Sequence, residues 1–235
     1  RQTDPLIDSD WRHMIQLFHC ISARSFRPLW LLEELGHPYE LHVLPFPPRV
    51  HRKDFLSLNP LGTIPLLVDG DVRMSESAAM CQYLAARLSP RQLDVAVDEN
   101  AYGDYLNLLH FGEATLTFPQ TLVLRYSYFE PDARRQPQVA QDYAKWFLAR
   151  LKTLDQRLAT AAYLCANRFT AADVSVGYAL LLAQHLGLEA QFTPNVAAYW
   201  ARLQERSAYQ RAQSAQWREA REQGILEIAA PDIRP

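Results

Sequence analysis

Hydrophobic and polar residues follow a mixed pattern in the first third of the chain and a purely helical one afterwards. The run MIQLFH at 14–19 is short, apolar and rich in β-forming residues, which predicts a strand. Leucines then recur at helical spacing from Leu29 to Leu35, and Gly36 supplies a stop. YELHVL at 39–44 alternates and predicts a second strand. Because the connection between the two strands is short, we expect a βαβ unit with parallel strands.

The next segment completes an α/β part of the chain. A proline-rich stretch follows, with one helical turn expected near 53–58. PLLVDGDVRM at 65–74 places two β-prone runs around Asp69 and Gly70, which is typical of a hairpin. SESAAMCQYLAARLSP at 75–90 predicts a helix that ends before Pro90. The predicted order is therefore βαβ, a short helix, then ββα.

From Asp98 onward the periodicity is helical throughout. Thr170 and Asp173 have the spacing of a capping box, and Phe169 and Val174 stand where a hydrophobic staple would. The expected long helical segments are 98–116, 138–160, 169–188 and 195–213. We expect four regions: an N-terminal extension over 1–13, an α/β domain over 14–89, a linker over 90–99 and an all-helical domain over 100–235.

Composition narrows the class of protein. Of 235 residues, 49% are hydrophobic and 21% charged, which is ordinary for a globular protein. The net charge of -2 does not favour nucleic acid or an anionic membrane as a partner. The three cysteines have no metal-site spacing and suggest free thiols in a reducing compartment. No apolar run approaches the ~18 residues of a membrane span. The opening segment carries three aspartates that a signal peptide would avoid. We expect a cytoplasmic protein without a metal.

Two neighbouring motifs predict a receptor for a small zwitterionic peptide. Pro65 has no N–H for a sheet ladder, so it should stand at the first residue of its strand. A cis Ile64–Pro65 bond would turn the backbone of Ile64 toward a ligand that binds like a strand. Glu76 and Ser77 lie where a helix begins, and its free N–H groups can receive a carboxylate. Glu76 can pair with an ammonium group.

These motifs resemble those of the cytosolic glutathione S-transferases. The resemblance rests on NPLGTIPLL, SES with its helix, FTAADVSVGYAL, and RPLWLLEELGHPYEL, which is similar to bacterial members. It implies a thioredoxin-like N-terminal domain, an all-helical C-terminal domain and a homodimer. It also implies that Ile64 binds the cysteinyl backbone of glutathione, that Pro65 is cis, and that Glu76 and Ser77 hold the γ-glutamyl end.

The same resemblance implies a catalytic role for the polar junction at the start of HCISARSFRPLWLLEELG, residues 19–36. In the family, a residue just before the first helix touches the glutathione sulfur. The spacing back from Gly36 places Ser22 where serine-type members, of theta or zeta kind, have their catalytic serine. A hydroxyl there, with the helix N-terminus and Arg24 or Arg27, would lower the pKa of a bound thiol from about 8.5. Ser25 is the better N-cap, and Cys20 suits a small buried residue.

Other ligand contacts are less specific. Relatives often carry Lys or Gln where Thr63 stands, and here His51, Arg52 or Lys53 could take its place in holding the glycine carboxylate of glutathione. A polar loop between prolines would have the same composition. Aromatic residues of the first long helix can line an electrophile site or lie in the core, and the candidates are Tyr102, Tyr105 and Phe111.

The sequence therefore predicts a glutathione transferase with glutathione as cosubstrate and a small hydrophobic electrophile as its other substrate. Two alternatives remain open. One is a non-catalytic relative that binds proteins or apolar ligands, although such a protein need not keep the TIP and SES motifs. The other is a glutathione-dependent thiol reductase, which needs a nucleophilic cysteine at the junction, where only Cys20 is near.

Overall fold

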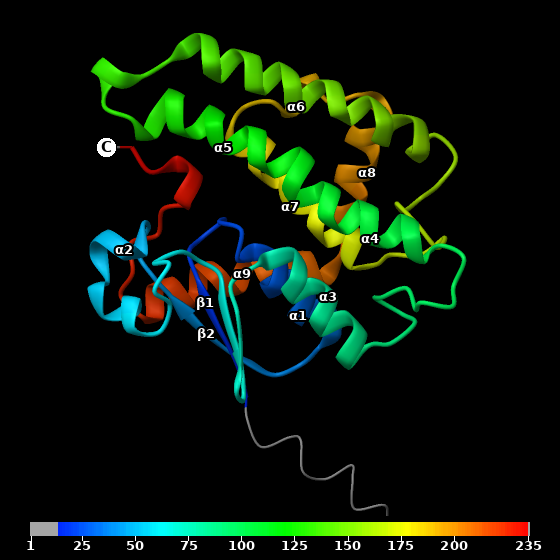
Figure 1. Ribbon diagram of the computed structural model, residues 1–235, viewed down its shortest axis with the longest axis horizontal. Helices are drawn as coiled ribbons and strands as arrows, with labels where there is room; N and C mark the ends of the chain where they lie inside the picture. The colour runs from blue at the N-terminus through cyan, green and yellow to red at the C-terminus, as the bar shows by residue number, and fades with distance from the viewer. Residues whose placement is uncertain (1–13, 235) are drawn as a thin grey trace, which may run out of the picture.

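The computed structural model describes residues 14–234, and it joins a four-stranded sheet to a helical half (Figure 1). The extension predicted over 1–13 lies outside the described residues. Strand β1 (Ile15–His19), helix α1 (Phe26–Leu35) and strand β2 (Tyr39–Val43) form a βαβ unit with β1 and β2 parallel, as predicted. Gly36 ends α1 in the left-handed conformation, at φ +60, and the next amide, of His37, bonds back to the carbonyl of Leu32.

The hairpin of β3 (Leu66–Asp69) and β4 (Val72–Met74) is antiparallel and also confirms the prediction. The strand order is β2-β1-β3-β4, and α1 packs beside α3 (Ser77–Leu88). A 3-10 turn (Lys53–Ser57) occupies the stretch where one helical turn was predicted. The short helix α2 (Pro48–His51), which was not predicted, precedes it; Pro48 stands in its first turn, where the missing N–H costs little.

The helical half begins with α4 (Tyr102–His110), a π-helical stretch (Phe111–Thr117), α5 (Phe118–Leu124) and a second π-helical stretch (Arg125–Phe129). It continues with α6 (Pro137–Leu158), α7 (Ala171–His185), α8 (Pro194–Gln204) and α9 (Ser207–Glu222). Two predicted segments differ. The first runs on past 116, because Pro119 lies in the first turn of α5 and does not interrupt it. The last splits, because Arg206 is extended.

Helix α7 is the buried centre of the molecule. The predicted capping box at its start is confirmed: the Asp173 carboxylate accepts the backbone N–H of Thr170 at 2.8 Å. Gly112 lets the first π-helical stretch approach α7, since a Cβ there would collide with Ser175. This close approach brings the side chain that follows, Glu113, to the α/β half of the molecule.

The end of the chain returns to the α/β half. Helix α9 packs on α1 and beside β2. After it, the side-chain amide of Gln223 accepts the N–H of Val43 at 2.9 Å and donates to the carbonyl of Leu41 at 2.7 Å, so it pairs with the outer edge of β2. Residues 225–234, which we call the C-terminal strap, then run past α2 toward the end of α5 (Figure 1).

No helix among residues 14–234 is long and apolar enough to cross a membrane. The same residues contain no group of three or more His, Cys, Asp or Glu side chains arranged to hold a metal ion.

Candidate functional site

A cavity of about 470 Å³ lies between the two halves of the molecule, and we call it the interdomain cavity. The α/β half contributes the junction after β1, the loop before β3 and the start of α3. The helical half contributes α5, the π-helical stretches, α7 and the strap. The lining residues are Ala23, Arg24, Phe46, Pro48, Arg49, Gly62, Thr63, Ile64, Pro65, Ser75, Glu76, Ser77, Glu113, Thr121, Leu124, Phe129, Tyr178, Leu182, Ala230 and Pro231.

Four of the predicted ligand contacts meet at this cavity. Ile64 and Pro65 line it, and the peptide bond between them is cis, as predicted. Their loop is held by Asn59, whose amide donates to the carbonyl of Thr63 at 2.7 Å. Glu76 and Ser77 line the cavity at the first turn of α3. The same cavity is therefore lined by a loop backbone and by a helix N-terminus.

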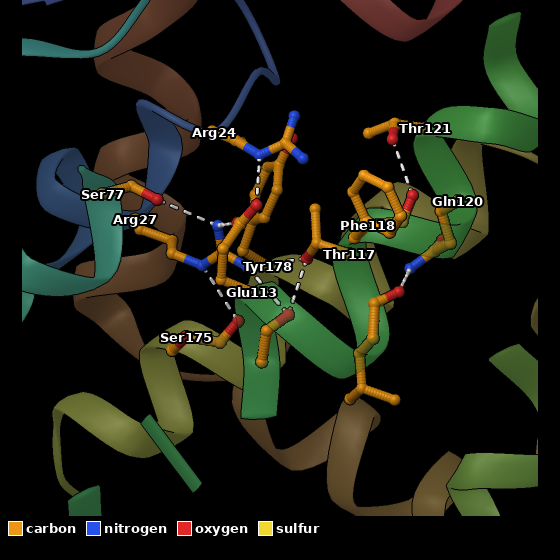
Figure 2. A network of polar contacts seen from close by, with 12 residues as sticks. Arg24, Arg27, Ser77, Glu113, Thr117, Phe118, Gln120, Thr121, Ser175 and Tyr178 are labelled. Atoms are coloured by element: carbon orange, nitrogen blue, oxygen red, sulfur yellow. Dashed lines mark hydrogen bonds and ion pairs between the residues drawn. The ribbon is translucent and has the colours of Figure 1, made fainter. Parts of the chain in front are cut away.

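Behind Ser77 lies the fully buried guanidinium of Arg27, which comes from α1 (Figure 2). It stacks on the ring of Tyr178 at 4.4 Å. All five of its N–H groups have acceptors, which belong to Ser77 (3.0 Å), Glu113 (2.5 Å), Gly112 (3.1 Å), Thr117 (2.7 Å) and Ser175 (3.1 Å). Arg27 thus connects α1 to α3, to the first π-helical stretch and to α7.

Glu113 joins this buried arginine to the cavity. Its carboxylate accepts from Arg27 on one oxygen and from Nε of Arg24 on the other, at 2.6 Å. Burial favours the neutral acid, but the guanidinium groups of Arg27 and Arg24 outweigh burial and lower the pKa of Glu113. Figure 2 shows the terminal nitrogens of Arg24 directed away from Glu113. Among the described residues, no hydrogen bond occupies them, so Arg24 offers charged donors to the cavity it lines.

Ser22, the predicted catalytic residue, lies beside the cavity but is not part of its lining. Its side chain is buried, its φ is +54, and its backbone N–H donates to Gln216 of α9 at 2.9 Å. The hydroxyl oxygen of Ser22 lies 3.5 Å from the donating amide of the same Gln216. The structure therefore places Ala23 and Arg24, the next two residues, at the wall and directs Ser22 toward α9.

Gln216 also accepts from the ring of His19 at 3.1 Å, and His19 is fully buried. Burial lowers the pKa of His19 to about 4 from 6.5, although the bond to Gln216 opposes the shift. The folded protein thus keeps this imidazole neutral in a pH range where the unfolded chain binds a proton. The stability that depends on this neutral imidazole is therefore fully present above pH 6.5 and is lost as the pH falls toward 4.

We expect this burial to make the protein less stable in acid by up to about 3 kcal/mol between pH 7 and pH 4. Urea denaturation of the wild type and of His19→Gln across this range measures the effect, and the variant should lose less stability. The exposed His110 supplies the control, since His110→Gln should follow the wild type. Equal acid sensitivity of His19→Gln and the wild type would contradict this origin.

The remaining predicted contacts lie elsewhere. His51 lines a different cavity, and Arg52 is bound to Asp54 on the surface at 2.7 Å. Arg49 and Thr63 line the interdomain cavity in this region instead. The sequence analysis did not select Arg49, because three other basic residues follow it closely in a proline-rich segment. The sequence alone does not define the path of that segment.

The three aromatic candidates for the electrophile site do not line the cavity. Tyr105 is 1% exposed in the core, and Tyr102 and Phe111 are half-buried against the same core, because their side of α4 and its π-helical continuation packs inward. The apolar wall instead comes from later residues: Leu124, Phe129, Tyr178 and Leu182. The ring of Phe129 packs against that of Phe46, which also lines the cavity, with 5.8 Å between the ring centroids. Helical periodicity shows which positions of a helix are apolar, but it does not show which apolar positions face a ligand and which lie in the core.

The sheet, the helical half and the cavity between them define a class of protein. Residues 21–87 match the family model described as glutathione S-transferase, N-terminal domain, and residues 120–207 match that of the C-terminal domain. The chain belongs to the glutathione S-transferase family of enzymes, which confirms the predicted family and fold.

Individual relatives agree with this assignment. Glutathione S-transferase 3 of Zea mays is 30% identical over 210 residues, which are 83% of this chain and 90% of the relative. Glutathione S-transferase 3 of Schizosaccharomyces pombe is 26% identical over 208 residues, or 83% and 85% of the two chains. The crystal structure of glutathione transferase URE2P8 from Phanerochaete chrysosporium, with oxidized glutathione, has a TM-score of 0.78 at 22% identity over 90% of this chain and 99% of that one. At that identity the likeness establishes the fold, and the serine-type subclass stays a prediction.

Proposed function

We propose that this protein binds glutathione in the interdomain cavity and transfers its thiolate to an apolar electrophile held against the helical half. The observation that carries the proposal is the composition of one cavity wall. Ile64, Glu76 and Ser77 stand on the α/β side, and Arg24 lines the same cavity while bound to Glu113 of the helical side. Glutathione is a zwitterionic peptide with a thiol near its middle, and these groups match its parts in order.

The two ends of the γ-glutamyl group have complementary partners. Its carboxylate would meet the N–H groups at the start of α3 and the hydroxyl of Ser77. Arg27 donates to the oxygen of Ser77, which leaves the hydroxyl hydrogen for the ligand. The ammonium group would pair with Glu76. The glycine carboxylate would lie toward Arg49 and Thr63, which line the cavity, in place of His51 and Arg52, the partners predicted from sequence.

For thiol activation we favour Arg24 over Ser22. A thiolate is stabilised by positive charge and hydrogen-bond donors at its sulfur. Arg24 lines the cavity with donors directed away from Glu113, whereas the hydroxyl of Ser22 faces Gln216. Bound as a thiolate, the sulfur attacks the electrophile; a new carbon–sulfur bond forms, and in a displacement the leaving group departs with its electron pair. Phe46, Leu124 and Phe129 would hold the electrophile.

The cysteine reductase alternative has less support. Cys20 is 1% exposed and lines a different cavity from Arg24. Burial raises the pKa of its thiol, which keeps it protonated and poorly nucleophilic. The homodimer and the cytoplasmic location stay predictions from the family.

Titration with glutathione tests the binding proposal. Glu76→Gln removes the charge that would pair with the ammonium group, and we expect glutathione to bind about tenfold more weakly, as for loss of a charge-assisted hydrogen bond. Isothermal calorimetry at neutral pH measures the change. Glu40→Gln, on the outer part of β2 and far from the cavity lining, is the control and should bind like the wild type. If Glu76→Gln binds with unchanged affinity, the γ-glutamyl group lies elsewhere.

A further inference from the structure

A second cavity, of about 580 Å³, lies on the other side of the C-terminal strap, and we call it the strap cavity. Its wall is largely apolar. The lining residues are Cys20, Ile21, Leu44, Pro45, Phe46, His51, Ile225, Leu226, Ile228, Asp232, Ile233 and Arg234. None of the predicted glutathione contacts except His51 belongs to it.

A thin partition separates the two cavities. Phe46 lines both of them. The strap contributes Ala230 and Pro231 to the interdomain cavity and the three residues after them to the strap cavity. Ile21 and Ala23, on either side of Ser22, likewise face different cavities. The strap therefore lies between the strap cavity and the part of the interdomain cavity that Phe46 lines.

Few contacts attach the strap to the rest of the fold. The N–H of Ala230 donates to the carbonyl of Ile21 at 2.7 Å. Asp232 pairs with His185, in the last turn of α7, at 3.0 Å, and the carboxylate is 44% exposed. The guanidinium of Arg234 stacks on the ring of Tyr128 at 3.9 Å. Exposed ion pairs such as that of Asp232 and that of Glu227 with Arg221 contribute little. The buried part of the strap consists of three small side chains, Ala229, Ala230 and Pro231, so displacing it would uncover little apolar surface.

The strap also carries exposed apolar side chains. Leu226 is 73% exposed and Ile228 is 40% exposed, and both line the strap cavity. An apolar chain that entered this cavity would cover such surface, which favours its binding. The strap cavity thus has the surface of a binding site for the far end of an apolar molecule.

We propose that the strap sets the length of electrophile the enzyme accepts, and that long, apolar electrophiles displace it and extend into the strap cavity. The inference rests on the proposed function, since the reactive end of the electrophile must lie beside glutathione. Short electrophiles fit within the interdomain cavity and leave the strap in place. Long ones pass the wall at Pro231 and Phe46 and continue along Ile228 and Ile233.

S-alkyl derivatives of glutathione test this inference without requiring turnover. S-methylglutathione and S-octylglutathione are titrated against the wild type by calorimetry, and hydrogen exchange of residues 225–234 is followed by mass spectrometry. We expect S-octylglutathione to bind more tightly, by about fourfold for each methylene that becomes fully buried. It should also accelerate exchange in the strap, whereas S-methylglutathione should leave that exchange unchanged.

Two variants of the strap sharpen the test. Asp232→Ala removes the pair with His185, and we expect about threefold tighter binding of S-octylglutathione and no change for S-methylglutathione. Glu227→Ala is the matched control, because Glu227 is also in the strap and also ion-paired, to Arg221, but lines neither cavity. It should bind both compounds like the wild type.

The outcomes separate the two proposals. If S-methylglutathione does not bind, the proposed function fails. If it binds, but S-octylglutathione binds no better or leaves strap exchange unchanged, the strap is a fixed wall and the inference is overturned.

Discussion

Replacing Arg24 by glutamine is expected to lower kcat/KM for conjugation of glutathione about a hundredfold, as for removal of one donor to a developing or bound anion. The guanidinium of Arg24 is the positive group at the cavity wall beside the predicted position of the sulfur. Without it, the pKa of the bound thiol should return toward its ordinary value of about 8.5. Arg24→Lys keeps the charge but loses the fixed fork that Glu113 orients, so it should retain part of the activity.

The thiolate itself provides the measurement. Thiolates absorb near 240 nm, and a difference titration of the glutathione complex against pH reports the thiol pKa directly. The matched variant is Ser22→Ala, which should keep a wild-type thiolate signal and activity within about threefold, because its hydroxyl faces Gln216. Loss of the signal in Ser22→Ala, with Arg24→Gln unaffected, would restore the serine-type mechanism that the sequence predicts.

Replacing Arg27 by methionine should have the largest effect on stability, a loss of about 3–5 kcal/mol in the free energy of unfolding. Arg27 is fully buried, and its removal takes one donor from acceptors in three elements, of which the carbonyl of Gly112 keeps the hydroxyl of Thr117. Within residues 14–234, its removal also leaves Glu113 with Arg24 as its one remaining ionic partner. Methionine fills much of the volume, so the loss reports the polar contacts more than a cavity.

Urea denaturation at neutral pH measures this loss. Arg218→Met is the control, since Arg218 pairs with Glu219 on the surface of α9 and is 58% exposed, and its stability should change by less than about 0.5 kcal/mol. The double variant Arg27→Met, Glu113→Leu removes both charges and should recover part of the stability. A loss below about 1 kcal/mol in Arg27→Met would show that the buried network contributes little to folding.

Local sequence signals predicted the elements that depend on neighbouring residues. The strand and helix periods of 14–44, the turn at Asp69 and Gly70 and the capping box of Thr170 and Asp173 all act within a few residues. The cis peptide bond before Pro65 was implied by the family resemblance, which rests on short motifs such as NPLGTIPLL. These features therefore did not require knowledge of the tertiary fold.

The site was predictable only in part because its remaining members come from distant segments. Arg27 and Glu113 are 86 positions apart, and the pattern of their own helices does not show that they meet. Ser22 and Arg24 are two residues apart, and the positive φ of Ser22 decides which of them faces the cavity. For Tyr105, helical periodicity identifies an inward face but does not distinguish a core from a cleft.

The contact between Gln223 and the edge of β2 has a consequence for how the chain is made. The unpaired groups of an edge strand are a template for joining another chain, and here a single side-chain amide occupies the N–H of Val43 and the carbonyl of Leu41. A ribosome delivers β2 about 180 residues before Gln223, so the nascent α/β domain keeps that edge without its Gln223 partner while those residues are made. Protection of this edge against aggregation thus begins only after α9 has been made.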